Sequence, residues 1–195
     1  ESVPASAEPY AGLCFMGGPM SVNDDLEWIA GVTNLIRDAV ARGIPVIGHC
    51  LGGQLMAKAL GGSVGRNAVK EIGWGRVDAV DAAAKTWLDG IDGFDAFHWH
   101  GETFTIPADA TRILGSAYCA NQAFVIGPHL GMQCHVEMTP AMIRLWTQQW
   151  AAESATASAS VQTPAQMFER IDERIATMRQ AADRLYTRWI AGLRH

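Results

Sequence analysis

The sequence has few cysteines, and none of them stand close together. The four are Cys14, Cys50, Cys119 and Cys134, and no two form a C-x-x-C pair. This spacing excludes a zinc ribbon and a thioredoxin-like redox motif. A disulfide framework is also not expected in a 195-residue chain with so few, widely spaced cysteines. We therefore predict reduced thiols and a cytoplasmic protein.

The sequence also lacks long apolar runs and basic clusters. No apolar stretch reaches the roughly 18 residues that a membrane span requires. Residues 1–10 carry two acidic side chains and no basic one, which is unlike a secretory signal. The 15 Lys and Arg residues against 20 Asp and Glu residues give a formal net charge of −5. We therefore expect neither nucleic acid nor a membrane as a partner.

What the sequence does contain is the alternation typical of an α/β domain. The apolar segments 10–16 and 44–48 are predicted to be buried strands, and the amphipathic segments 26–42 and 51–60 to be helices. A composition of 49% hydrophobic and 18% charged residues suits a folded chain with a sizeable core. Strand, helix, strand and helix in this order predict a parallel sheet covered by helices.

The rest of the chain is predicted to add short strands and two helices. Thr139-Pro140 begins one helix, and a capping box at residues 163–166 begins a long amphipathic one. We expect one domain over residues 1–152, a linker at 153–163 and a C-terminal helix at 164–195 that packs on the same domain. The short strands are expected near residues 75–80, 95–99, 112–117, 123–126 and 130–134.

The strongest chemical signal is the segment Gly48-His49-Cys50-Leu51-Gly52-Gly53-Gln54, which follows a buried strand and opens a helix. A G-x-nucleophile-x-G segment in that place forms a nucleophile elbow, with Cys50 as the nucleophile. Glycines flank the turn because a Cβ would clash in so sharp a bend. Cys50 would also stand at a helix N-terminus, where free N–H groups favour a thiolate. A buried cysteine in a glycine-rich turn is the purely structural alternative.

Two further segments complete a catalytic pattern. His135 and Glu137 stand two residues apart after a short strand, so an extended chain would place both on one face. An imidazole next to a carboxylate can take a thiol proton and return it to a leaving group. Gly17-Gly18-Pro19 follows the first strand, where a glycine N–H can donate to a developing oxyanion. We expect all these segments at the carboxyl ends of strands, where α/β sheets place their sites.

The order of these segments resembles the triad-type class I glutamine amidotransferases. The family pattern GGP, G-x-C-L-G-x-Q and H-x-E matches residues 17–19, 48–54 and 135–137. The resemblance covers about residues 10–150 and implies a doubly wound, mostly parallel, flavodoxin-like α/β sheet with helices on both faces. Further stretches resemble a stand-alone branch similar to the amidotransferase part of GMP synthase; they are residues 17–24, 70–75, 97–104 and 121–124.

The resemblance implies a catalytic triad. Cys50 would be the nucleophile, His135 the general base and acid, and Glu137 the carboxylate that orients the histidine. The implied reaction is hydrolysis of glutamine or another γ-glutamyl amide through a γ-glutamyl thioester, with release of ammonia. Neither a metal nor an organic cofactor is implied.

The resemblance also implies residues that bind the substrate. The backbone N–H groups of Gly18 and Leu51 would form the oxyanion hole. Gln54 and the backbone around His100 and Gly101 would hold the amino-acid end of the substrate.

Departures from the family pattern leave alternatives open. Val136 replaces the usual proline between His and Glu, and Trp99 stands where glutamine-binding members often have a small or amide residue. The alternatives are a γ-glutamyl peptidase or hydrolase acting on γ-glutamyl conjugates, and a non-catalytic regulatory protein on the same fold. The sequence contains no Walker-type phosphate loop, so we expect any ammonia-consuming synthetase partner to be a separate chain. The sequence also leaves open whether the protein forms a homo-oligomer.

Two other patterns have simpler interpretations. His98 and His100 would lie on one strand face, as metal ligands do, but the sequence offers no third ligand, so we predict no metal site. Cys134, next to His135, is interpreted as a small apolar residue rather than a redox partner of Cys50.

The start of the sequence also differs from the family. Members of this type begin with a strand–helix–strand unit, whereas only a short polar stretch precedes Tyr10 here. Such a unit takes roughly 30 residues. We therefore expect the native protein to be longer at its N-terminus, with a strand–helix unit before the given sequence.

Overall fold

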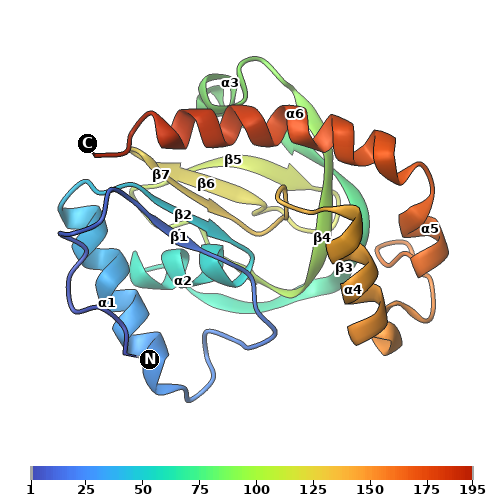
Figure 1. Ribbon diagram of the computed structural model, residues 1–195, viewed down its shortest axis with the longest axis horizontal. Coiled ribbons are helices and arrows are strands. Elements are labelled where there is room, and N and C mark those ends of the chain that lie inside the picture. Colours follow the sequence, from blue (N-terminus) through green and yellow to red (C-terminus); the bar gives the residue numbers. More distant parts are fainter. Residues whose placement is uncertain (1, 195) are drawn as a thin grey trace.

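A curled seven-stranded sheet carries helices on both of its faces in the computed structural model, which describes residues 2–194 (Figure 1). The strand order is β1-β2-β7-β6-β5-β3-β4. The strands are β1 (Leu13–Phe15), β2 (Val46–His49), β3 (Val64–Ala79), β4 (Gly93–Phe104), β5 (Thr111–Ser116), β6 (Ala123–Ile126) and β7 (His129–Met132). The helices are α1 (Glu27–Ala41), α2 (Leu51–Ala59), α3 (Ala82–Leu88), α4 (Pro140–Gln149), α5 (Pro164–Phe168) and α6 (Ile171–Ile190), with a 3-10 turn, η1 (Ala151–Ser154).

The parallel part of the sheet consists of β1, β2 and β7. β2 pairs in parallel with β1 on one side and with β7 on the other. All four of its residues are buried, as the continuous apolar run predicts for a strand covered on both faces. The carboxyl ends of these three strands therefore meet at one edge, and the candidate catalytic segments follow there.

The other strand pairs, from β7 through β6, β5 and β3 to β4, are all antiparallel. The α/β class is confirmed, but the parallel pairing expected for most of the sheet holds only for β1, β2 and β7. The cause is chain length between strands. β6 ends at Ile126 and β7 begins at His129, which leaves room for a tight turn and none for the crossover that parallel neighbours need.

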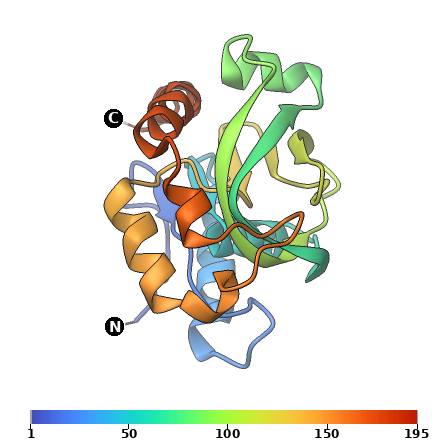
Figure 2. The same cartoon turned by 90° about the vertical axis from the view of Figure 1, so that its right-hand side faces the viewer.

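β3 and β4 form a long curved ribbon that extends beyond the rest of the sheet (Figure 2). The strand expected near residues 75–80 is only the end of β3, which begins at Val64. The polar residues in the first half of β3 hide it from a search for apolar runs, and a register shift between Arg66 and Glu71 breaks its alternation. The sequence analysis also missed α3, whose N-cap Asp81 accepts a hydrogen bond from the N–H of Ala83.

Two hydrophobic cores lie on the two faces of the sheet. α1 and α2 cover one face around Ile36, Ile44 and Met56. On the other face α6 runs along the sheet and packs with Met178 and Leu185 into the second core (Figure 1). The fold therefore brings its last long helix over the strands that end near Cys50.

The C-terminal segment differs in detail from one continuous helix. The capping box between Thr163 and Gln166 is present and begins α5. Glu169 is extended and Arg170 has a φ of 53°, so a break separates α5 from α6. In the segment before it, Val161 forms a β-bridge with Ile72 of β3.

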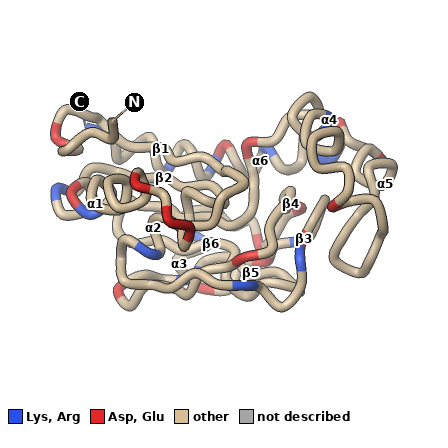
Figure 3. The backbone as a smooth tube through the Cα atoms, turned by 90° about the horizontal axis from the view of Figure 1, so that it is seen from below, with Lys and Arg blue, Asp and Glu red and all other residues tan. Residues whose placement is uncertain are grey.

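No helix among residues 2–194 is both long enough and apolar enough to cross a membrane. Figure 3 shows the Lys and Arg residues at scattered positions along the chain, with Asp and Glu residues among them.

Candidate active site

The turn between β2 and α2 holds Cys50 in an unusual backbone conformation. Cys50 has a φ of 50° and a ψ of −107°, where non-glycine residues are rare. Its N–H donates to the carbonyl of Met132 over 2.8 Å, which ties the turn to the end of β7. Surrounding structure must fix such a conformation, and nucleophile elbows are a known case. The predicted nucleophile therefore stands on a sharp strand-to-helix turn.

Two glycines after Cys50 let α2 begin close against the sheet. A Cβ on Gly52 would collide with the carbonyl of Phe15 in β1. A Cβ on Gly53 would collide with the carbonyl of Met132 in β7. The helix start is thus seated between two strands, and this close approach is the physical reason for the glycines in the elbow segment.

His135 and Glu137 lie together, as their spacing predicts. Nδ1 of His135 is 2.6 Å from Oε1 of Glu137. β7 has already ended at Met132, and two backbone hydrogen bonds of 2.8 and 3.1 Å fix His135 against Phe97 of β4. The Trp146 ring packs edge-to-face on the imidazole, with 5.0 Å between the ring centroids. Backbone, ring face and Nδ1 of His135 are therefore all held in place.

The electrostatics of this pair favour two opposite charges. Burial would lower the pKa of His135, but the charge of Glu137 and hydrogen bonding to Cys50 and Glu137 raise it to about 10. Burial would raise the pKa of Glu137, and the neighbouring His135 instead lowers it to about 2. At neutral pH the pair is an imidazolium beside a carboxylate.

The Gly17-Gly18 loop after β1 lies against the same residues. A Cβ on Gly17 would stand 3.1 Å from Cε1 of His135 and 3.6 Å from Cβ of Cys50. A Cβ on Gly18 would stand 3.0 Å from Cδ2 of Leu51. The two predicted oxyanion donors are therefore neighbours. Leu51 is also the first residue of α2, so its N–H has no acceptor within its own helix.

Gln54 reaches the nucleophile through a residue that the sequence analysis did not single out. Its Nε2 donates to Oε1 of Gln133 over 3.0 Å. Nε2 of Gln133 lies 3.5 Å from the Cys50 sulfur, within reach of a weak hydrogen bond. Both glutamines are buried. Gln133 follows β7 directly and stands two residues before His135. Its closeness to the H-x-E segment was the signal in the sequence that could have identified it.

His100 and Gly101 line the site, but the His100 side chain takes part in a separate buried cluster. Its Nε2 lies 3.1 Å from Oε2 of Glu71, and its Nδ1 lies 2.9 Å from the Glu102 carbonyl. Glu71 also accepts hydrogen bonds of 2.7 Å from Ser116 and from Gln122. The cluster fixes β4 where His100 and Gly101 line the cavity, and the substrate-binding role of their backbone stays a prediction.

Glu71 was missed because its partner lies on another strand. The register of β3 and β4 sets Glu71 opposite His100, and ligand atoms of Glu71, His98 and His100 lie within 4.8 Å of one another. The third ligand absent from the local sequence is thus supplied by β3. However, protein donors already occupy both Glu71 oxygens, and burial lowers the pKa of His98 to about 4. A buried hydrogen-bond network explains the cluster, and the absence of a metal stays a prediction.

A cavity of about 480 Å³ opens onto Cys50 and His135. Trp99, Trp146 and Trp150 form an aromatic wall, with ring centroids 5.4 to 6.1 Å apart. The cavity also carries charge, because Lys70 and Glu153 form an ion pair of 2.7 Å along its lining.

The chain matches the model of the glutamine amidotransferase class I family over residues 1–144. It is 32% identical over 147 residues to the glutamine amidotransferase-like protein YfeJ of Salmonella typhimurium, covering 71% of this chain and 62% of that protein. It is also 32% identical over 143 residues to the glutamine-hydrolyzing GMP synthase of Aeromonas hydrophila, covering 66% of this chain and 26% of that protein. The chain thus spans less than two thirds of these relatives.

Solved structures show the same fold. The glutamine amidotransferase from Methylobacillus flagellatus superposes with a TM-score of 0.96 at 45% identity, covering all of this chain and 82% of that one. A glutamine amidotransferase from Thermotoga maritima gives a TM-score of 0.83 at 29% identity, covering 94% of this chain and 80% of that one. The chain therefore belongs to the class I glutamine amidotransferase family.

Proposed function

We propose that this protein hydrolyses the amide of a γ-glutamyl group, most simply free glutamine, through a Cys50–His135–Glu137 triad. The observation that carries the proposal is one assembly at the ends of β2 and β7. Cys50 stands on a strained elbow, and His135 is held 2.6 Å from Glu137 while it interacts with Cys50. This is the arrangement that a cysteine nucleophile needs for acyl transfer.

The first half of the reaction forms the acyl-enzyme. The Cys50 thiolate attacks the γ-carbonyl carbon, and a C–S bond forms as the carbonyl oxygen takes up negative charge. The N–H groups of Gly18 and Leu51 stabilise that oxygen. The C–N bond then breaks, and His135 gives its proton to the departing nitrogen, so ammonia leaves. Glu137 stabilises the imidazolium and fixes its orientation.

The second half releases glutamate. Water attacks the γ-glutamyl thioester, and His135, now neutral, takes the proton from that water. The C–S bond breaks, and the sulfur leaves as the thiolate beside the imidazolium that has just formed. The site thus returns to its starting charges, and neither a metal nor an organic cofactor is required for any step.

The cavity supplies the remaining substrate contacts in this proposal. Gln54 and the backbone near Gly101 both line it and would hold the amino-acid end of glutamine. Family membership supports glutamine hydrolysis, and one relative is a glutamine-hydrolyzing GMP synthase. We propose that a separate synthetase chain takes up the ammonia here.

The tryptophan wall favours a second candidate function. A cavity of about 480 Å³ is in the size range that holds drug-sized ligands, and glutamine is smaller than these. Trp99 lies close to the nucleophile, with its carbonyl oxygen 4.0 Å from the Cys50 sulfur. Aromatic faces there would accommodate a leaving amine larger than ammonia. A γ-glutamyl peptidase acting on γ-glutamyl conjugates would use the same triad.

A substrate panel distinguishes these functions. The purified protein is incubated with glutamine, γ-glutamyl dipeptides and γ-glutamyl anilides, and ammonia, glutamate and free amine are each measured. Ammonia from glutamine alone supports the first function, and amine release with little glutaminase activity supports the second. Neither activity, together with no reaction of Cys50 with a glutamine-like chloroketone, would support a non-catalytic regulatory protein and overturn the proposal. Cys50→Ser serves as the blank.

A further inference from the structure

The second oxygen of Glu137 faces residues outside the triad. Oε1 is 2.6 Å from His135, whereas Oε2 is buried and has no hydrogen-bond partner among residues 2–194. An ionised oxygen that is cut off from water and unpaired is costly, so the surrounding groups decide whether the carboxylate keeps its position. One polar group beside it is His49, whose Nε2 lies 4.0 Å from Oε2.

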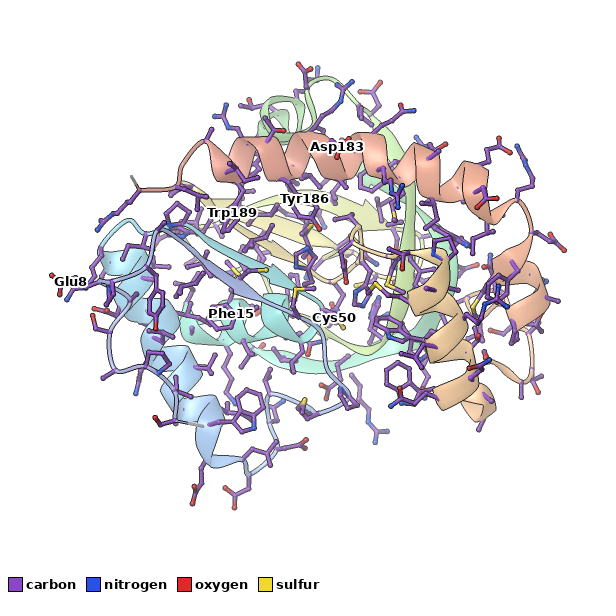
Figure 4. The ribbon with its side chains drawn as sticks, in the orientation of Figure 1. Glu8, Phe15, Cys50, Asp183, Tyr186 and Trp189 are labelled. Atoms are coloured by element: carbon purple, nitrogen blue, oxygen red, sulfur yellow. The ribbon has the colours of Figure 1, made fainter. Side chains whose placement is uncertain are left out.

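His49 is itself held by a tyrosine from the C-terminal helix. Nε2 of His49 lies 2.9 Å from the hydroxyl of Tyr186 in α6. Figure 4 labels Cys50 at the end of β2 and Tyr186 on α6, with the tyrosine side chain directed from the helix toward the sheet. His49 is 2% exposed, so this contact lies in the interior. A residue far along the chain thus reaches the residue just before the nucleophile.

Protonation decides how this contact acts on Glu137. Burial lowers the pKa of His49 and outweighs the opposing effect of Glu137, so the ring is neutral at neutral pH. The Tyr186 hydroxyl and Oε2 of Glu137 both lie beside Nε2 of this ring, at 2.9 and 4.0 Å. The hydrogen bond with Tyr186 therefore fixes the edge of the neutral imidazole that lies beside Oε2 of Glu137. The charged or titratable groups facing His49 and Tyr186 include Glu137, His135, Cys14 and Cys134.

We propose that His49 and Tyr186 are positioning residues of the active site, which hold the Glu137 carboxylate through its free oxygen and so keep His135 aligned with Cys50. The family model matches residues 1–144, and Tyr186 lies beyond that segment. The C-terminal helix is therefore part of the working site as well as a cover for the sheet. This inference rests on the proposed function, because it assigns a partner to the proposed triad.

The first test removes one hydroxyl group. Tyr186→Phe is compared with Tyr118→Phe, whose side chain is exposed and away from the cavity. We expect Tyr186→Phe to lower kcat by roughly 5- to 20-fold with KM changed by less than about twofold, since misaligned catalytic groups slow the chemical step more than binding. Tyr118→Phe should match the wild type. His49→Gln, which keeps an N–H donor, should retain more activity than His49→Leu.

The second test asks whether the effect passes through Glu137. In a Glu137→Gln background, Tyr186→Phe should have almost no further effect on kcat, because residues that act as one unit are not additive. Thermal unfolding of each variant separates this result from a loss of fold. Equal losses from Tyr186→Phe in both backgrounds, or a kcat equal to that of Tyr118→Phe, would overturn the proposal.

A third measurement needs no substrate and so separates this inference from the proposed function. Alkylation of Cys50 by iodoacetamide is followed against pH by mass spectrometry of its peptide, in a Cys14→Ser background. A better-held Glu137 keeps His135 cationic, and this favours the thiolate. Half-maximal alkylation should therefore move to higher pH in Tyr186→Phe and not in Tyr118→Phe. An unchanged profile would refute the positioning role even if no hydrolysis were found for any substrate.

Discussion

Gln133 links Gln54 to the nucleophile, with one end of its amide 3.0 Å from Gln54 and the other 3.5 Å from the Cys50 sulfur. A neutral N–H donor near the sulfur orients it and stabilises negative charge on it. The same amide holds Gln54 in the cavity wall. This one side chain therefore couples the nucleophile to a residue proposed to bind substrate.

Gln133→Leu is expected to reduce hydrolysis on both counts. The change removes the donor to sulfur and leaves the buried Gln54 amide without its acceptor, so we predict a fall in kcat/KM of roughly 10- to 100-fold, equal to about 1.4 to 2.8 kcal/mol of transition-state stabilisation. Steady-state kinetics on the best substrate of the panel measures it. Gln148→Leu, an exposed glutamine on α4, is the matched control. Equal kinetics for the two variants would show that Gln133 has no part in the site.

Cys50→Ser is expected to abolish turnover and leave the fold intact. Serine is similar in size, but its hydroxyl is a much weaker nucleophile at neutral pH. The hydroxyl stays protonated even beside the imidazolium, so no anion is present to attack the substrate. Cys14→Ser, Cys119→Ser and Cys134→Ser should keep most activity. Burial raises the pKa of all three thiols, and none of them lines the cavity. Near-wild-type hydrolysis by Cys50→Ser would contradict the proposed mechanism.

The triad segments could be found in the sequence because their chemistry is local. Cys50 stands between glycines in one short segment, and His135 and Glu137 are two residues apart. The residues that support them come from distant segments. Tyr186 reaches the site only because α6 packs along the sheet.

The antiparallel half of the sheet was harder to predict for a related reason. Apolar runs identify strands such as β2, but pairing direction depends on the length of the connections and on packing across the whole sheet. Glu71 illustrates this limit. The residue lies in a polar part of β3, and its burial follows from pairing with His100 across the ribbon.

Glu71→Gln is expected to destabilise the protein strongly. The carboxylate accepts hydrogen bonds from Ser116 and Gln122 and lies 3.1 Å from His100, all in the interior. An amide would turn one acceptor into a donor facing other donors. Breaking a buried charged network of this kind costs about 3 kcal/mol in the free energy of unfolding, which urea denaturation would detect as a lower midpoint.

Glu153→Gln is the comparison for that change. Glu153 forms its ion pair with Lys70 while partly exposed to solvent. Pairs of this kind contribute about 1 kcal/mol or less. If Glu71→Gln and Glu153→Gln unfolded at the same urea concentration, the buried network would have no special role in stability.

The final prediction concerns stability against pH and follows from the His135–Glu137 pair. The pKa of Glu137 falls from an ordinary 4.5 to about 2 on folding, so its stabilising effect is complete above pH 4.5 and is lost as the pH falls toward 2. The pKa of His135 rises from 6.5 to about 10, so its effect is complete below pH 6.5 and is lost as the pH rises through about 10. Both contributions are fully present between pH 4.5 and 6.5.

Glu137→Gln should therefore flatten the acid side of the stability curve and move the alkaline loss to lower pH, because His135 then lacks its anionic partner. The urea midpoint of unfolding, measured at steps from about pH 2.5 to about pH 10.5, would show both changes. The ionic strength is kept constant across the series, because salt screens charge interactions. Glu27→Gln is the control, since Glu27 is exposed on α1 and takes part in none of the ion pairs found within residues 2–194. Parallel curves for Glu137→Gln and Glu27→Gln would mean that the 2.6 Å contact between His135 and Glu137 carries no net charge interaction in solution.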